Sequence, residues 1–195
     1  MQSRIIGILL FMILTGAVYG QTHLFRAHIA RNKTADGQTN SCVVTITVIT
    51  RSDPQNIQMI HYNANYLNED VFKDRNFVRY YVPGKNKRAG DADNDFGDLV
   101  VTDLNADGRE DFAVKNDAGG NGGPSYNFYL QNDKGIFALD KYLTDSVGSF
   151  PKFINKENKT ITTLVHANVG EDCKSIYQFN PATGKWTRVN RVWIR

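Results

Sequence analysis

The sequence predicts an all-β fold, and three observations support this prediction. Helical periodicity is scarce, whereas short runs that alternate apolar with polar residues recur, as in Phe128-Tyr129-Leu130. Turn-forming segments rich in Asn and Gly separate these runs, at 132–135 and 180–185 for example. Short strands at short spacing predict a small propeller-like or sandwich-like arrangement of antiparallel strands.

The strand candidates cover most of the chain, and no sharp shift in composition marks a domain boundary. We therefore expect a single domain over residues 21–195, with one helical turn at most at 141–146. The candidate strands are residues 24–30, 43–50, 57–62, 76–82, 99–103, 111–115, 126–131, 135–139, 161–166, 175–180 and 188–194.

The first twenty residues have the pattern of a secretory signal peptide. Arg4 precedes an apolar run over residues 5–14, and small residues follow up to Gly20. We expect cleavage between Gly20 and Gln21, which gives a periplasmic or secreted protein with no membrane attachment. The alternative is an uncleaved N-terminal anchor, although the apolar run is short for a membrane span.

The overall composition excludes several classes of protein. The 195 residues carry a formal net charge of +3, which is too small to indicate a nucleic-acid partner by itself. Only two cysteines are present, which rules out a disulfide-dense miniprotein or a zinc ribbon.

Export to an oxidising compartment would allow these two cysteines to form a disulfide. Cys42 begins a β-branched run and Cys173 precedes a strand candidate near the C-terminus. In an oxidising compartment the simplest prediction is a Cys42–Cys173 disulfide, which would close a loop of roughly 130 residues and stabilise the fold by about 5 kcal/mol. The alternative is two separately buried thiols.

Residues 103–111 form an acidic loop with the pattern D-x-N-x-D-G-x-x-D. Alternate side chains turn toward one point, the glycine permits a sharp turn, and this number of hard oxygen donors suits Ca²⁺. An EF-hand is excluded, because the twelfth position is Val114 and a strand pattern follows. The alternative is an Asx-rich turn without metal. The predicted ligands are the side chains of Asp103, Asn105, Asp107 and Asp111 and the backbone carbonyl of Arg109.

A second run of carboxylates lies upstream at Asp91–Asp98, with its glycine one place later. Four carboxylates this close repel one another unless a cation offsets them. A second calcium ion and a solvated loop balanced by Lys85, Lys87 and Arg88 are both open here.

A glycine-rich segment, Gly-Gly-Asn-Gly-Gly, occupies residues 119–123. Glycines lack Cβ, so the backbone can turn sharply and approach a partner closely. The alternative is that the glycines only permit a bulged turn and that Tyr126 belongs to the core, since Tyr126 and Phe128 share a strand face. The predicted partner-binding residues are Gly120, Asn121, Gly122, Ser125 and Tyr126.

Residues 99–114 resemble the calcium-loop core of the FG-GAP/VCBS type of repeat. The order of calcium loop, glycine segment and aromatic strand over residues 96–140 resembles a family of exported bacterial proteins that includes periplasmic inhibitors of lysozyme-like effectors. The resemblance implies a propeller-like β fold, bound calcium, and an inhibitor or immunity role against a lysozyme-like or other peptidoglycan-cleaving enzyme.

The sequence gives no positive sign of catalysis. The four histidines, His23, His28, His61 and His166, are scattered, and neither H-E-x-x-H nor G-x-S-x-G is present. We therefore expect a non-enzymatic protein. The alternatives to an inhibitor are a calcium-stabilised module that binds glycans or proteins, and a hydrolase with an unrecognised site.

Overall fold

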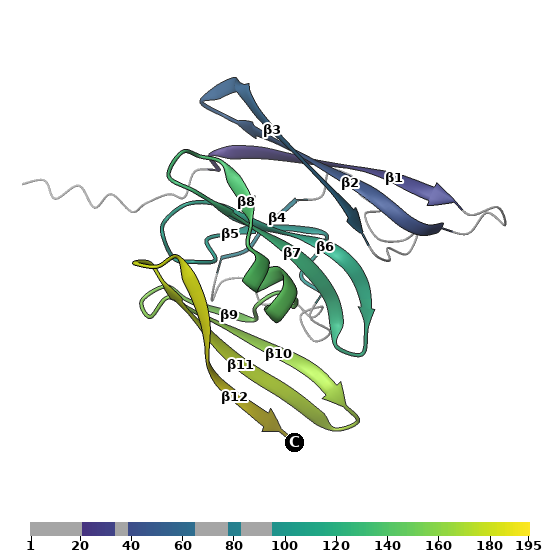
Figure 1. The fold of residues 1–195 in the computed structure, drawn as a ribbon, viewed down its shortest axis with the longest axis vertical. Coiled ribbons are helices and arrows are strands. Elements are labelled where there is room, and N and C mark those ends of the chain that lie inside the picture. The colour runs from purple at the N-terminus through teal and green to yellow at the C-terminus, as the bar shows by residue number, and fades with distance from the viewer. Residues whose placement is uncertain (1–20, 34–38, 65–77, 83–94) are drawn as a thin grey trace, which may run out of the picture.

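The structure is a computed structural model, and it describes residues 21–33, 39–64, 78–82 and 95–195 (Figure 1). The all-β prediction is confirmed, because the described residues form mainly antiparallel sheets and almost no helix. The predicted signal peptide, residues 1–20, lies outside the described residues. No helix within the described ranges is long and apolar enough to cross a membrane.

Three sheets follow one another along the described chain. Their neighbouring strands are antiparallel, except that β4 and β5 are parallel. The first sheet contains β1 (His23–Lys33), β2 (Thr39–Thr50) and β3 (Asp53–Ala64). The central sheet contains β4 (Val78–Tyr80), β5 (Leu99–Thr102), β6 (Asp111–Gly120), β7 (Gly123–Gln131) and β8 (Phe137–Leu139). The last sheet contains β9 (Phe153–Asn155), β10 (Thr160–Asn168), β11 (Glu171–Asn180) and β12 (Lys185–Ile194).

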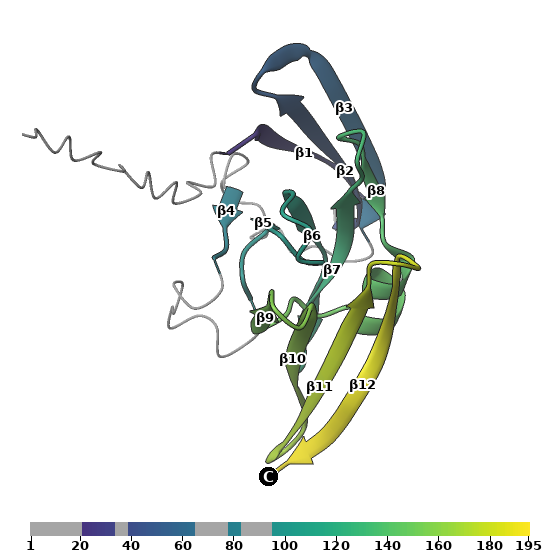
Figure 2. The same ribbon diagram turned by 90° about the vertical axis from the view of Figure 1, so that its left-hand side faces the viewer.

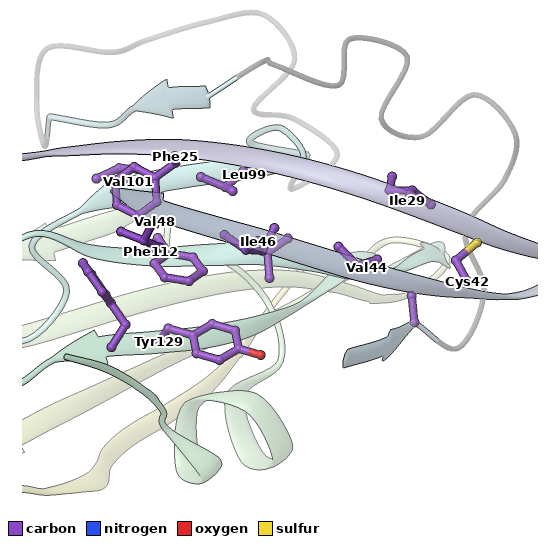
Figure 3. Close-up of a cluster of buried hydrophobic side chains, with 13 residues drawn as sticks. Phe25, Ile29, Cys42, Val44, Ile46, Val48, Leu99, Val101, Phe112 and Tyr129 are labelled. Atoms are coloured by element: carbon purple, nitrogen blue, oxygen red, sulfur yellow. The ribbon is translucent and has the colours of Figure 1, made fainter. Parts of the chain in front are cut away.

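The central sheet is buried on both faces, because the other two sheets lie on its opposite sides (Figures 1 and 2). Alternate residues of a strand point to opposite faces. Accordingly Phe112 and Tyr129 pack against β1 and β2 of the first sheet (Figure 3). Tyr126 and Phe128 belong to a second cluster that includes Ile161 of the last sheet. The double burial explains why all four residues of β5 are buried.

Each strand candidate overlaps an observed strand, but some bounds differ. The candidate at 111–115 continues to Gly120 as β6, through residues that rarely form strands, and its register with β7 is broken at two irregularities. The short strand β9 was not predicted. The helical turn expected at 141–146 is found as a short helix that ends in the π-helical segment η2 (Leu143–Val147).

The disulfide prediction is wrong. Cys42 lies on β2 in the core between the first and central sheets, whereas Cys173 lies on β11 of the last sheet. The central sheet separates the two residues, and both are buried thiols that are not joined to each other. The first and last strands do not meet either, since β1 pairs with β2 and β12 with β11.

Candidate functional site

The acidic loop connects β5 to β6 and folds back on its own backbone. Asp103 accepts hydrogen bonds from the amides of Asp107 (3.0 Å, at Oδ1) and Gly108 (3.2 Å, at Oδ2). Asn105 Oδ1 accepts from the same Asp107 amide at 3.1 Å. Positive φ values at Ala106 (57°) and Gly108 (88°) allow this tight path. The side-chain oxygens of Asp103 and Asn105 are thereby brought together, whereas the Asp107 carboxylate accepts hydrogen bonds from the Arg109 amide and from Asn105 Nδ2, both at 2.9 Å.

Asp111 closes the loop from inside the protein. It is fully buried, and its two carboxylate oxygens accept hydrogen bonds from the amides of Leu104 and Gln131, both at 2.9 Å. Burial raises the pKa of Asp111 well above its usual value, and repulsion from Asp107 and Asp103 adds to this rise. A nearby cation would favour the ionised form of this buried carboxyl.

Positively charged side chains of the protein already contact the loop. Lys156 Nζ lies 2.8 Å from Asp103 Oδ2, and Arg109 Nη2 lies 2.6 Å from Asp107 Oδ2. Lys159 Nζ donates to the carbonyl of Ala106 at 2.9 Å. Sequence reasoning missed both lysines, because they lie in the turn between β9 and β10, about fifty residues away, and carry no local motif.

The donor set of the loop fits Ca²⁺. No group of three His, Cys, Asp or Glu side chains in the described ranges is arranged as a metal site, but calcium loops also use amide and carbonyl oxygens. The loop supplies two carboxylates and one amide oxygen on alternate residues, beside a buried third carboxylate. A bound ion would share or displace the contacts of Lys156 and Arg109 with these carboxylates.

Glu110 extends the loop to the first sheet. Its carboxylate accepts hydrogen bonds from the amides of Thr22 (3.2 Å) and His23 (3.1 Å), and from the Thr22 hydroxyl (2.6 Å). His23 Nδ1 also lies 2.9 Å from Glu110 Oε2. The acidic loop therefore joins the start of β1, the central sheet and, through Lys156 and Lys159, the last sheet.

A pocket of about 410 Å³ lies beside the acidic loop. Tyr80, Tyr81 and Val101 form its apolar side, and Asp103 and Glu110 form part of its polar side. The pocket can accept a small group that has both apolar and charged parts.

The second acidic segment is partly described. The carboxylates of Asp95 and Asp98 each lie 3.0 Å from the buried ammonium group of Lys115. The protein thus supplies a cation of its own at this place, one that sequence reasoning did not identify. Residues 91–94, with the lysines and arginine considered as counter-ions, lie outside the described residues.

The glycine-rich segment forms the tip of the β6–β7 hairpin. Gly119 has φ +72°, and a Cβ there would lie 2.0 Å from the carbonyl oxygen of Gly123, so only glycine fits. Gly120 and Asn121 are exposed. A Cβ at Gly122 would lie 3.1 Å from the Val165 side chain, so the tip rests on the end of β10.

Tyr126 is not a partner-binding residue, and this prediction is wrong. Its side chain is 1 % exposed and packs against Phe128 and Phe150. Its hydroxyl donates to the Gly97 carbonyl (3.0 Å) and accepts from the Phe96 amide (3.2 Å), and burial raises its pKa. The core alternative is the correct one. Ser125 is half-buried on β7, opposite Asp117.

Three histidines have polar neighbours at hydrogen-bond distance. His23 contacts Glu110, His61 Nδ1 lies 2.9 Å from Thr45 Oγ1, and His166 Nδ1 lies 2.8 Å from Asp172 Oδ1. The His166–Asp172 pair is exposed and stands at the β10–β11 hairpin, close to the tip of the β6–β7 hairpin.

Comparison with known proteins gives one likeness in structure. Neither a protein-family model nor a curated protein matches the chain. Among solved structures, the chain is similar to one described as "Structure of a Xanthomonas Type IV Secretion System related protein". The TM-score is 0.55 at 14 % sequence identity, over 87 % of this chain and 77 % of that one. At this identity the likeness shows a shared fold.

Proposed function

We propose that the protein is an exported, calcium-binding inhibitor or immunity protein that blocks a lysozyme-like peptidoglycan hydrolase, and that it has no catalytic activity of its own. The observation that carries the proposal is the β6–β7 hairpin, whose glycine-rich tip exposes Gly120 and Asn121. The assignment to exported proteins rests on the signal-peptide pattern of residues 1–20.

The hairpin tip is suited to enter the cleft of an enzyme. Gly120 has open space around the position of a Cβ, so the backbone there can approach a partner closely. The Asn121 amide can donate hydrogen bonds to the carboxylates of a glycoside-cleaving cleft. The tip is also held in place, because Gly122 lies against Val165 of the last sheet. A preorganised loop loses little entropy on binding.

Calcium has a structural role in this proposal. Asp103, Asn105 and Asp107 would hold the ion through side-chain oxygens, Arg109 through its carbonyl, and Asp111 would complete the negative charge. Because β6 begins at Asp111, an ion in this loop would fix the strand that leads to the hairpin tip.

The order of the sheets supports a propeller-like arrangement. The three sheets follow one another along the chain, and the first and last are antiparallel meanders. In this proposal each sheet corresponds to one blade of the propeller. The signal peptide directs the protein to the periplasm or the outside of the cell.

Two glycine variants test the proposal with a matched control. Gly119→Ala forces a Cβ into the Gly123 carbonyl at positive φ, whereas Gly120→Ala places its methyl group in open space. We expect the Gly119→Ala variant to lose inhibition of a panel of lysozyme-type enzymes. The domain as a whole should remain folded. We expect Gly120→Ala to be affected less. A wild-type protein that binds and slows none of these enzymes would overturn the proposal.

A second candidate is a calcium-stabilised module that binds glycans or proteins without inhibition. The exposed Trp193 favours it, since 56 % of its surface is accessible and an indole ring can stack on a sugar. Binding of peptidoglycan fragments by a protein that leaves hydrolase rates unchanged would favour this candidate.

A further inference from the structure

The pocket beside the acidic loop has walls from all three parts of the fold. Gln21 lies just before β1, Val101 belongs to β5 of the central sheet, and Lys156 follows β9 of the last sheet. Figures 1 and 2 both show β5 and β9 on the same side of the molecule. The volume of about 410 Å³ lies within the range of small-molecule sites, which is about 300–1,000 Å³. The pocket therefore has room for one compact ligand.

The apolar side of the pocket is held in place before any ligand arrives. This side consists of Tyr80, Tyr81, Val82 and Val101. The Tyr81 hydroxyl donates to the carbonyl of Lys152 at 2.9 Å. The Tyr81 ring packs edge-on against Phe150, with 5.6 Å between the ring centres, and Val101 is buried in the core. Because this wall is already ordered, a ligand that packs on it loses little entropy to ordering of the protein.

The two carboxylates in the pocket wall are already engaged by the protein. Glu110 accepts hydrogen bonds from the amides of Thr22 and His23 and from the Thr22 hydroxyl. Asp103 accepts hydrogen bonds from two backbone amides of its own loop and from Lys156 Nζ at 2.8 Å. A cationic ligand would have to displace these partners, so the carboxylates do not select one.

Two donors of the pocket wall retain capacity for a ligand. The Thr102 side chain is buried, and its hydroxyl has no hydrogen-bond partner among the described residues. Arg109 donates from Nε to the Gln131 carbonyl and from Nη2 to Asp107, which uses two of its five side-chain N–H groups. A buried hydroxyl without a partner costs stability, so its presence at a pocket indicates an acceptor on a ligand.

We propose that this pocket binds a small carboxylate ligand with an aromatic or other apolar body. The carboxylate accepts hydrogen bonds from Thr102 and Arg109 near the ammonium group of Lys156, and the apolar body lies against Tyr80 and Tyr81. Two positive and two negative side chains stand among the described residues of the lining, so directed hydrogen bonds rather than net charge provide the recognition. Hydrogen bonds from charged donors favour a carboxylate over a neutral carbonyl group.

This site goes beyond the proposed function, because the hairpin tip at residues 119–123 is not part of the pocket lining. Binding of a small carboxylate here requires no hydrolase. The inference and the proposed function can therefore fail independently of each other.

An NMR titration of the mature protein, residues 21–195, with phenylacetate and phenylacetamide tests the inference. The two compounds have nearly the same shape, but only phenylacetate is charged. We expect phenylacetate to bind with a Kd of about 1 mM and to shift the backbone amide signals of Tyr81 and Thr102. Phenylacetamide should bind about 10-fold more weakly, because it lacks the charged acceptor.

Thr102→Val separates binding from stability, because it replaces the hydroxyl with a methyl group. We expect the affinity for phenylacetate to fall by about 5-fold. The melting temperature should equal or exceed that of the wild type, since the variant loses no buried hydrogen bond of the protein. A purely structural role of Thr102 would give the reverse result, with a lower melting temperature and unchanged affinity.

The turn between β9 and β10 provides a matched control. Lys156 and Lys159 both contact the acidic loop, through Asp103 at 2.8 Å and through the Ala106 carbonyl at 2.9 Å, but only Lys156 lines the pocket. We expect Lys156→Gln to weaken binding of phenylacetate by about 10-fold, because it removes the charge beside the carboxylate. Lys159→Gln should bind within about twofold of wild type.

Three results would overturn the inference. If phenylacetate shifts no signal of the pocket residues, the site is refuted, whether or not the protein inhibits a hydrolase. If phenylacetate and phenylacetamide bind equally tightly, the carboxylate is not recognised. If Lys156→Gln and Lys159→Gln weaken binding equally, the effect belongs to the acidic loop as a whole and not to the pocket. A protein that binds phenylacetate but slows no hydrolase would retain this site and lose the proposed function.

Discussion

The Tyr126 hydroxyl offers a sharp test of the buried position that the structure gives this residue. Tyr126→Phe removes one oxygen and leaves the ring in place. The oxygen accepts a hydrogen bond from the Phe96 amide and donates one to the Gly97 carbonyl, and both residues are buried. The variant therefore leaves two buried backbone groups without this partner.

The expected cost follows from the number of groups affected. A buried polar group that loses its hydrogen bond costs about 1–3 kcal/mol. Relaxation of the loop before β5 can recover part of this energy for two adjacent groups, so we expect Tyr126→Phe to lower the free energy of unfolding by about 2–3 kcal/mol. Inhibition by the folded variant should stay unchanged.

Urea denaturation followed by tryptophan fluorescence measures this change. Tyr129→Phe is the matched control, because Tyr129 lies on the opposite face of the same strand and its hydroxyl makes no hydrogen bond within the described part of the chain. We expect Tyr129→Phe to cost less than about 1 kcal/mol. The reasoning is refuted if the two variants are equally stable, or if Tyr126→Phe folds like the wild type yet no longer inhibits.

Three further predictions concern charged groups. Removal of calcium by a chelator should lower the melting temperature, and Asp107→Ala should reproduce this effect without chelator, because a ligand bound only by the folded state stabilises it. Lys115→Met should lower the free energy of unfolding by about 1–3 kcal/mol, since two partly exposed aspartates lose their shared cation. Burial raises the pKa of Asp140. The free energy of unfolding of the wild type, compared with that of Asp140→Asn, should therefore increase as pH falls through the raised pKa and decrease as pH rises through it.

Each of these predictions has a contradicting result. An identical melting curve with and without chelator, together with metal-free purified protein, would end the calcium proposal. A Lys115→Met variant as stable as wild type would show that the ammonium group does not offset the carboxylates. A stability difference between wild type and Asp140→Asn that is constant with pH, in urea titrations at several pH values, would contradict the raised pKa.

Local sequence patterns predicted most of the strands but not the way the sheets stack. Alternation revealed β7, and Asn132 with Gly135 revealed the turn that follows it, because these signals act over a few residues. Cys42 and Cys173 were paired in error because no local signal reports that a whole sheet lies between them. Contacts between distant strands depend on the packing of both faces of the central sheet.

The same limit applies to the candidate site. The spacing of Asp103 and Asn105 identified two oxygens that the structure brings to the same backbone amide, since the loop supplies them over three residues. The carboxylate of Asp107 instead contacts Arg109. Lys156 could not be identified, because it comes from a turn between strands of another sheet. Tyr126 alternates with Phe128 at a period of two, which already indicated that its side chain lies in the core. The prediction of a partner-binding role gave more weight to the neighbouring glycines, and it was wrong.

The contacts of the acidic loop with all three sheets have a consequence for unfolding. Glu110 holds the first residues of β1, and Lys156 holds the turn before β10, so opening of this one loop removes polar links to both outer layers at once. With the loop closed, the three layers should exchange their amide hydrogens through a single cooperative opening. With the loop opened by Glu110→Ala and Lys156→Ala, the amide hydrogens of the outer sheets should exchange faster than those of the central sheet. A segment of nine residues would then determine whether the chain unfolds as one cooperative unit or as several.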